Sequence, residues 1–204
     1  MGYWDRRVAL VIGAGDGPGQ AIALGLARRG AAVMAAHINP TLADATADAI
    51  QAAGGQALSY TVDIGNRFQV AAMIEQLRDA FGGLHLVVNA WWVNKRQPFL
   101  TLDEYDWRRV IEVNLTGAFL VGQLAGRVMV DEGGGAIVQL LPPVAPGAVQ
   151  QAPYAASAAG LAALCAAMAA ELEPLGVRVL AIPTLDSVDA TVAAVLNALQ
   201  QALE

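Results

Sequence analysis

Cysteine and charge are both scarce in this chain. Its 204 residues include one cysteine, Cys165, so no internal disulfide can form, and the expected compartment is a reducing cytoplasm. Only 15% of the residues are charged and the net charge is −6, which disfavours the clusters of lysine and arginine that nucleic acids and anionic membranes attract. Neither partner is expected.

Charge is absent altogether between Gly133 and Ala170. Prolines interrupt this stretch, at Pro142, Pro143, Pro146 and Pro153, which argues against a membrane-spanning helix. Because 56% of the chain is hydrophobic, the stretch is expected to lie in the interior and in a contact between subunits.

Apolar runs alternate with helical patterns along the whole chain. Strands are expected near residues 8–12, 32–36, 56–61, 84–89, 135–141 and 177–182, with helices between them and a last helix near 188–203. This alternation predicts an α/β fold in one Rossmann-like domain, residues 1–204. Its doubly wound parallel sheet has about six strands and forms the middle of three layers, αβα.

Capping residues and glycines indicate where several helices begin and end. Thr101 and Glu104 form a capping-box pattern, which predicts the start of one long helix. Gly30, Gly82 and Gly176 stand where the preceding helices are expected to stop.

A glycine-rich turn follows the first expected strand. Gly13, Gly17 and Gly19 lie between residues 8–12 and a helical pattern that starts at about residue 21. Glycines let the backbone approach a pyrophosphate, and the helix start offers unpaired N–H groups and the positive end of its dipole. We interpret the turn as a phosphate site, with a tight turn that binds nothing as the alternative.

Five motifs in order resemble the short-chain dehydrogenase/reductase family, over about residues 8–182. They are the glycine turn, with the family's Thr-Gly-x-x-x-Gly-x-Gly spacing of glycines, Asp63-Ile64, Val88-Asn89-Ala90, Val113-Asn114-Leu115 and Tyr154-Ala155-Ala156-Ser157. The resemblance is to a divergent and C-terminally shortened member. It implies an NAD or NADP cofactor and hydride transfer between nicotinamide and a carbonyl or alcohol carbon.

The resemblance implies four catalytic positions, of which the chain fills two. Tyr154 matches the tyrosine that exchanges the proton, and Asn114 matches the asparagine that supports a water relay. The family's lysine, four residues after the tyrosine, is Ala158, and its serine falls on or beside Leu141. Ser157 is not expected to replace that serine, because the helix backbone fixes its position.

The resemblance also assigns residues to the cofactor: Gly13, Gly17, Gly19, His37, Asp63, Asn89 and Ala90. His37 replaces the acidic residue of NAD-binding relatives, and no basic residue stands there for a 2′-phosphate. Asp16 would repel an extra phosphate, which favours NAD slightly over NADP. Asp63 is either an adenine contact or a helix cap.

Two substitutions disturb the implied cofactor cleft. Trp91 stands where the family's Asn-Asn-Ala-Gly pattern ends in glycine, and its indole would plug the cleft so that no nucleotide binds. The alternative is that the loop turns Trp91 and Trp92 into a subunit contact or surface pocket. Pro18 has no N–H for the pyrophosphate, which predicts weaker phosphate binding.

The segment after the sixth expected strand is shorter than in the family that the chain resembles. Residues 183–186 lead almost directly into the last helical pattern, so the family's lid over the substrate is expected to be shortened or missing. His37 and His85 have no ligand neighbours at suitable spacing, and no metal site is expected.

Two functional hypotheses follow. The favoured one is a catalytically inactive or impaired relative that serves as a binding or structural subunit, as a homo-oligomer (dimer or tetramer) or with an active homologue. The alternative is a working NAD(P)-dependent oxidoreductase that uses Tyr154 with an atypical proton route.

Overall fold

The computed structural model describes residues 4, 7–145 and 147–203. Six parallel strands form one sheet in the order β3-β2-β1-β4-β5-β6. The strands are β1 (Val8–Ile12), β2 (Ala32–His37), β3 (Ala57–Thr61), β4 (Leu86–Asn89), β5 (Gly135–Leu141) and β6 (Val177–Pro183). The predicted doubly wound α/β architecture is confirmed, and the expected strands lie within two residues of the observed ones.

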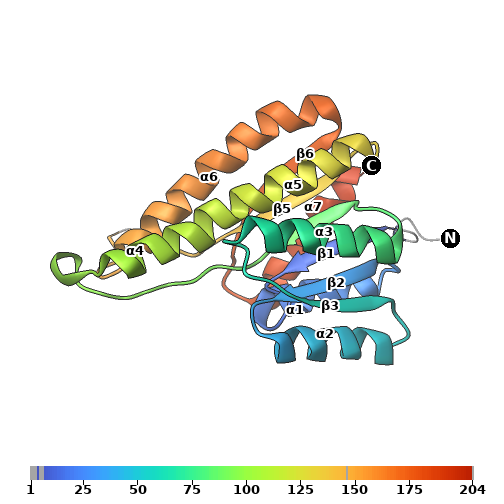
Figure 1. The fold of residues 1–204 in the computed structure, drawn as a ribbon, viewed down its shortest axis with the longest axis horizontal. Coiled ribbons are helices and arrows are strands. Elements are labelled where there is room, and N and C mark those ends of the chain that lie inside the picture. Colours follow the sequence, from blue (N-terminus) through green and yellow to red (C-terminus); the bar gives the residue numbers. More distant parts are fainter. Residues whose placement is uncertain (1–3, 5–6, 146, 204) are drawn as a thin grey trace.

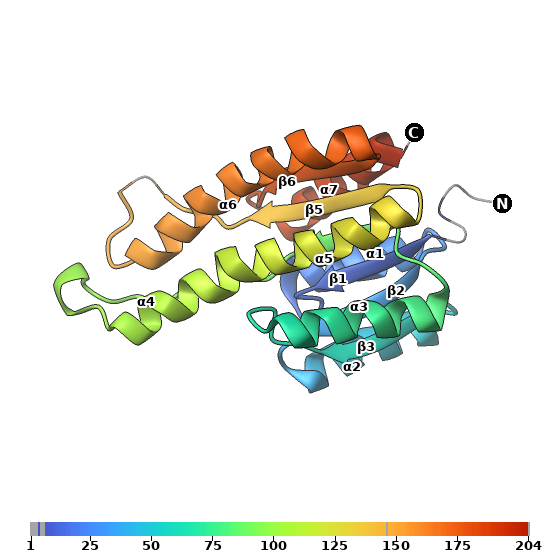
Figure 2. The ribbon, with the colours of Figure 1, turned by 45° about the horizontal axis from the view of Figure 1, so that its top comes forward.

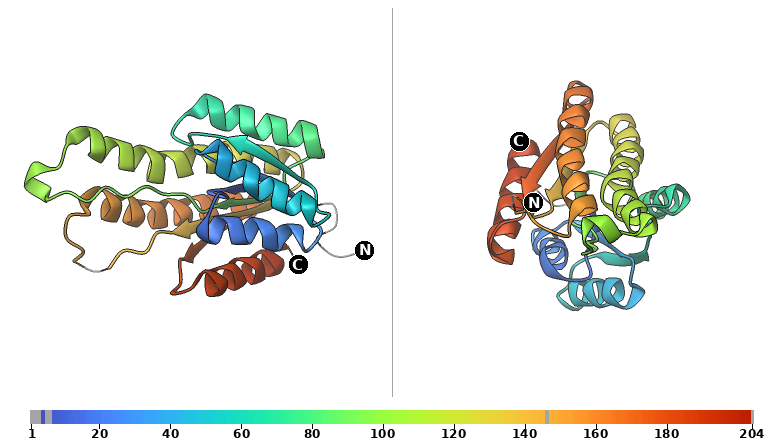
Figure 3. Two further views of the ribbon diagram at one scale, coloured as in Figure 1. Left: turned by 90° about the horizontal axis from the view of Figure 1, so that it is seen from below. Right: turned by 90° about the vertical axis from the view of Figure 1, so that its left-hand side faces the viewer.

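Helices cover both faces of the sheet (Figure 1). They are α1 (Gly17–Ala27), α2 (Pro40–Ala52), α3 (Arg67–Phe81), α4 (Glu104–Ile111), α5 (Ala118–Asp131), α6 (Ala152–Leu172) and α7 (Val188–Leu203), with short turns η1 (Phe99–Thr101), η2 (Glu112–Gly117) and η3 (Glu173–Leu175). Helices α1, α2 and α7 pack on one face, and α3, α5 and α6 on the other (Figures 2 and 3). The π-helical turn η2 joins α4 to α5 in one continuous rod.

Two large apolar clusters, one on each face of the sheet, form most of the core, and a smaller third cluster lies around Leu161 and Cys165. Every residue of β1 is buried, because this central strand has helices on both sides. Its side chains alternate, so Ala9 and Val11 face the α1 and α7 side while Leu10 and Ile12 face the α3 and α5 side. The two large clusters therefore hold β1 in place and fix where the chain leaves it.

The helix that carries Asn114 starts differently from the prediction. Thr101 lies in η1, and the N-cap of α4 is Asp103, whose carboxylate accepts a hydrogen bond from the Tyr105 N–H at 2.7 Å. The predicted capping box of Thr101 and Glu104 is wrong, because Leu102 and Asp103 are extended and place the aspartate at the helix start.

Two of the three glycines predicted to end helices do so, and the third lies a few residues beyond the end of its helix. Gly82 and Gly176 adopt left-handed φ angles of 83° and 84° and end α3 and η3. Gly30, with φ 102°, lies in the turn beyond α1, which ends at Ala27, and its N–H donates to the Ala27 carbonyl.

Prolines do not interrupt α6. Pro142 and Pro143 precede it, Pro153 fits its first turn, and Pro146 lies outside the described residues. By length and composition alone, residues 104–131 and 152–175 could each span a membrane, a test that core helices of soluble proteins also pass. Only 22% of the most apolar window of the second stretch is buried, so much of α6 presents apolar surface.

An arm projects beyond the sheet at the carboxyl ends of its strands (Figures 1 and 2). It contains η1, α4, the start of α6 and the loops beside them. Gln97 joins these parts, because its N–H donates to the Gln150 carbonyl, its Nε2 to Asp106, and its Oε1 accepts from the Asp103 N–H. Residues 184–187 alone connect β6 to α7, and the shortened or missing lid stays a prediction.

Gly19→Ala should destabilise the protein strongly. A Cβ at Gly19 would overlap the carbonyl of Gly13, a backbone group that cannot swing aside. Gly54→Ala is the matched control, because a Cβ there would meet nothing within 4 Å and only its φ of 83° is unfavourable. In urea denaturation we expect Gly19→Ala to lose about 1–3 kcal/mol more than the control. Equal losses would contradict the packing of the turn.

Candidate active site and nucleotide cleft

Tyr154 lies in the first turn of α6, with only 4% of its surface exposed. Burial raises the pKa of its phenol to about 12. Within the described part of the chain, no side chain hydrogen-bonds to the phenol oxygen. The environment therefore favours the neutral phenol and opposes formation of the phenolate.

Asn114 is buried in η2 and holds three segments together. Its Oδ1 accepts from the Val93 N–H at 2.8 Å, and its Nδ2 donates to the Val93 carbonyl at 2.9 Å and to the Ser157 hydroxyl at 3.1 Å. Ser157 Oγ in turn donates to the Tyr154 carbonyl at 2.9 Å. As expected, the backbone fixes the Ser157 hydroxyl.

The positions expected for the serine and lysine offer no polar side chain. Leu141 ends β5, and its side chain packs against the buried cluster around Leu161 and Cys165. A hydroxyl that sequence reasoning missed lies near it, but Thr184 Oγ1 donates to the Leu141 carbonyl at 2.9 Å. The single lysine of the sequence, Lys95, has its Nζ 3.6 Å from Asp106 Oδ1. A carboxylate therefore already pairs with the only ammonium side chain.

The glycine turn keeps two of its expected phosphate donors. A Cβ at Gly13 would lie 2.7 Å from the Ala90 carbonyl oxygen, so glycine allows the two backbones to pack together. Gly17 begins α1, and a Cβ there would meet nothing within 4 Å. Pro18 has no N–H, so the Gly17 and Gly19 amides are the donors left at this helix start.

His37 ends β2 and is 4% exposed. Its Nδ1 accepts from the Asn39 N–H at 3.0 Å, which assigns the ring proton to Nε2. That nitrogen is buried and has no hydrogen-bond partner among the described residues. The Trp91 indole meets the imidazole edge to face, with ring centroids 4.6 Å apart and planes at 78°.

Trp91 and Trp92 turn to opposite faces of the sheet. Trp92 packs against the cluster on the α1 and α7 side, and Trp91 against the other one. The contact with His37 places the Trp91 indole beside the carboxyl end of β2, and whether it blocks nucleotide binding stays a prediction.

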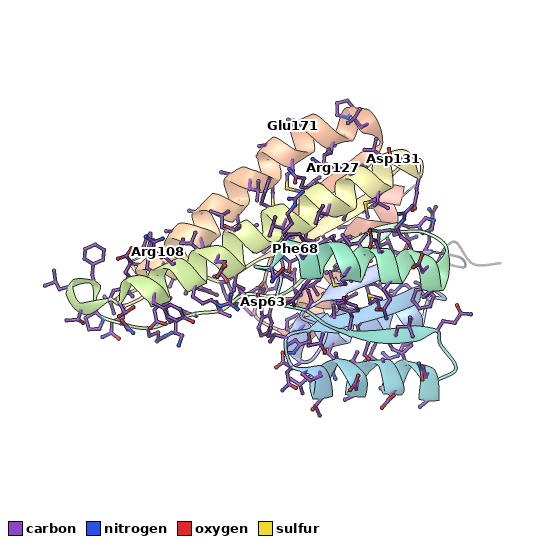
Figure 4. The ribbon with its side chains drawn as sticks, in the orientation of Figure 1. Asp63, Phe68, Arg108, Arg127, Asp131 and Glu171 are labelled. Carbon is purple, nitrogen blue, oxygen red and sulfur yellow. The ribbon has the colours of Figure 1, made fainter. Side chains whose placement is uncertain are left out.

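Asp63 does not cap a helix, so that alternative was wrong. The N-cap of α3 is Asn66, whose side chain accepts from the Phe68 and Gln69 N–H groups. Asp63, labelled in Figure 4, accepts from the Gly65 N–H at 3.0 Å and forms a 2.8 Å ion pair with Arg109 on α4. The turn after β3 is thereby tied to the arm, and the adenine contact stays a prediction.

A buried amide pair joins β4 to β5 beneath the site. Asn89 Nδ2 donates to Gln139 Oε1 at 2.9 Å, and Asn89 Oδ1 accepts from the backbone N–H of Trp91 at 3.4 Å. Gln139 Nε2 is buried and has no partner among the described residues. Sequence reasoning missed Gln139, although a glutamine within a buried strand is itself an unusual signal.

The structure brings most of the predicted residues to one edge of the sheet. The glycine turn, His37, Asn89 and Ala90 follow or end β1, β2 and β4, three neighbouring strands. Asn114 and Tyr154 approach the same edge from η2 and α6, where Ser157 links them. In open α/β sheets, this edge is where ligands bind.

Stability should fall as pH rises from about 10 to 12. In the unfolded chain the phenol loses its proton near pH 10. In the folded protein its pKa is about 12, so it loses the proton only at higher pH. The stability given by neutral Tyr154 is thus complete below pH 10 and lost above it. Urea denaturation over this range should show a fall on the order of 2–3 kcal/mol that Tyr154→Phe lacks. Parallel curves for both proteins would contradict the raised pKa.

Comparisons with known proteins agree with this geometry. A family model described as short chain dehydrogenase matches residues 7–197. The chain is 36% identical over 175 residues to subunit BbsD of (2S)-[(R)-hydroxy(phenyl)methyl]succinyl-CoA dehydrogenase from Thauera aromatica, covering 86% of this chain and 71% of that protein. It is 41% identical over 181 residues to cis-4-hydroxycyclohexanecarboxylate dehydrogenase from Sinomonas cyclohexanicum, covering 87% and 72%.

A solved structure matches over almost the whole chain. It is a metagenomic short-chain oxidoreductase in complex with NADP, with a TM-score of 0.90 and 28% identity, covering 98% of this chain and 92% of that one. The fold, the glycine turn, the family match and these relatives lead to one conclusion: the chain belongs to the short-chain dehydrogenase/reductase family.

Proposed function

We propose that this member of an NAD(P)-binding oxidoreductase family is catalytically inactive or impaired and serves as a binding or structural subunit. The observation that carries the proposal is the burial of Tyr154, which raises its pKa to about 12 where the family's lysine would lower it. Leu141 and Ala158 replace the hydroxyl and ammonium groups that would assist it.

The size of these losses supports the proposal. Ionising a phenol of pKa about 12 at neutral pH costs about 7 kcal/mol, at 1.36 kcal/mol for each pKa unit. Loss of one positioned donor to the reacting oxygen costs about a hundredfold to a thousandfold in rate. Both losses act on the same proton transfer.

The second candidate is a working NAD(P)-dependent oxidoreductase with an atypical proton route. Two observations favour it: the free amides of the glycine turn, and the solved NADP complex that matches along 92% of its own length. This candidate would use Tyr154, and either a partner subunit would complete its proton route or the substrate would need no general acid.

For the cofactor, we propose nucleotide binding that is weaker than usual for the family. When bound, the nicotinamide would supply or accept the hydride. The Gly17 and Gly19 amides would hold the phosphates without help from Pro18. The acidic Asp16 at the helix start keeps the slight preference for NAD over NADP.

For the partner, we propose a second copy of this chain on the α5–α6 face. A groove of about 530 Å³ lies between the two helices, and most of its lining residues are apolar. Its lining residues include Phe119, Gly122, Gly126, Leu164, Met168, Leu172 and Leu175. Arg127, Asp131 and Glu171 line it with charges of both signs (Figure 4).

The charges explain why a second copy fits this groove. In a two-fold arrangement the same surface faces itself, so basic residues of one copy can meet acidic residues of the other. A dimer, or a tetramer built from it, is the proposed assembly, and pairing with an active homologue through the same face is the alternative. Nucleic acid and membranes are not proposed as partners.

Cys165 supports the proposed cytoplasmic location and has no catalytic role. Its thiol is free and buried in α6, and burial raises its pKa to about 11. A thiol with such a pKa is almost entirely protonated at neutral pH and reacts poorly.

The purified wild-type chain should not turn over carbonyls or alcohols with NAD, NADH, NADP or NADPH. Leu141→Ser with Ala158→Lys, in a Trp91→Gly background, should raise the rate at least about a hundredfold, as expected for a restored donor. The nicotinamide absorbance measures the rate, and adding Tyr154→Phe is the control that should abolish it. Clear wild-type turnover would instead establish the second candidate.

Light scattering at micromolar concentration should show a dimer or tetramer for the wild type. Phe119→Asp places a charge in the groove, where burial against a second copy disfavours it, and should yield monomers. Val188→Asp, on α7 across the sheet, is the matched control and should leave the assembly intact. A monomeric wild type would refute the proposed pairing.

A further inference from the structure

The contact between Trp91 and His37 crosses the end of β1. In the sheet, β1 lies between β2, which ends at His37, and β4, which Trp91 follows after one intervening residue. Ile12, the last residue of β1, pairs with Ala36 on one side and Asn89 on the other. The indole therefore reaches over the point where the chain leaves β1 for the glycine turn.

Packing fixes the imidazole more firmly than the indole. A Cβ on Gly15 would lie 2.9 Å from His37 Cγ and 2.6 Å from Leu42 Cβ, so the glycine turn and α2 close in on the ring. Trp91 is only half-buried. Its backbone can move little, because Asn114 binds both backbone groups of Val93 two residues later. Rotation of the Trp91 side chain is thus the motion that would separate the two rings.

His37 carries a donor that the protein leaves unused. Its Nε2–H is buried and finds no acceptor among the described residues, while Nδ1 is occupied by the Asn39 N–H. Buried donors without acceptors are rare, so each calls for an explanation. At the end of the second strand of a Rossmann-like sheet, the neighbouring ligand group is the ribose of a nucleotide, with hydroxyl or 2′-phosphate oxygens as acceptors.

The two halves of the nucleotide site therefore differ. At the pyrophosphate half, the space beside Gly17 is open and helix amides are free. At the adenosine half, the indole is pressed against the residue that would meet the ribose. The residues present fit the phosphates and do not fit the adenosine while the indole stays in this position.

We infer that the Trp91 indole is an internal occupant of the adenosine half of the nucleotide site. Rotation of this side chain opens the site and exposes the His37 Nε2–H as a donor to a ribose hydroxyl or 2′-phosphate oxygen. The inference concerns binding alone, so it stands or fails separately from the proposed loss of turnover.

Calorimetric titration of the purified full chain with NAD and with NADP tests the inference. The wild type should bind each with a Kd weaker than about 1 mM, and Trp91→Gly at least about tenfold more tightly. Trp92→Gly, which removes the neighbouring indole from the other face, is the matched control and should bind as the wild type does. Thermal melting confirms that each variant is folded, and Trp91→Ala replaces Trp91→Gly if the latter does not fold.

The role of His37 is tested in the Trp91→Gly background. His37→Leu, which removes the donor, should weaken binding at least about tenfold, and His37→Gln, which keeps an N–H near the same place, should stay within about threefold. A larger loss with NADP than with NAD identifies the 2′-phosphate as the acceptor, and equal losses identify the ribose hydroxyl. Three results would overturn the inference: wild-type binding in the low micromolar range, no gain in Trp91→Gly, or an equal gain in Trp92→Gly.

Discussion

The close packing of the glycine turn against the loop after β4 is the constraint on which the site depends. Because Gly13 and Gly19 have no Cβ, the turn can lie directly against the Ala90 carbonyl and against itself. The same contact fixes where the chain continues from Ala90, and so where Trp91 can reach. The same backbone contact therefore shapes the glycine turn and positions the Trp91 indole beside the adjacent part of the cleft.

Around Tyr154, the main constraint is the free energy needed to form a charged phenolate at a buried position. Tyr154 is buried, Leu141 packs against an apolar cluster, and the only ammonium side chain of the sequence is paired with Asp106. Without a nearby cation, burial acts on the phenol unopposed. The chain thus keeps the architecture of the family, while Ala158 and Leu141 stand where the family's lysine and serine are expected.

Much of the fold could be predicted from the sequence, since apolar runs and helical periods report burial directly. The parallel sheet, the glycine turn and the Gly82 stop all follow from short-range patterns. The start of α4 could not be predicted, because Thr101 and Asp103 can both cap a helix and the extended backbone at Leu102 selects between them. The contact of Trp91 with His37 also needed the structure: a rotamer at the edge of a sheet depends on tertiary neighbours that no local pattern encodes.

Gln97 has a consequence for how the arm can move. Its backbone and both ends of its side chain join the loop after β4, the segment before α6 and the start of α4. Hydrogen bonds of one residue, Gln97, thus connect three segments of the arm. The ion pair of Arg109 with Asp63 also connects α4 to the turn after β3. These segments of the arm therefore cannot separate without breaking a hydrogen bond of Gln97.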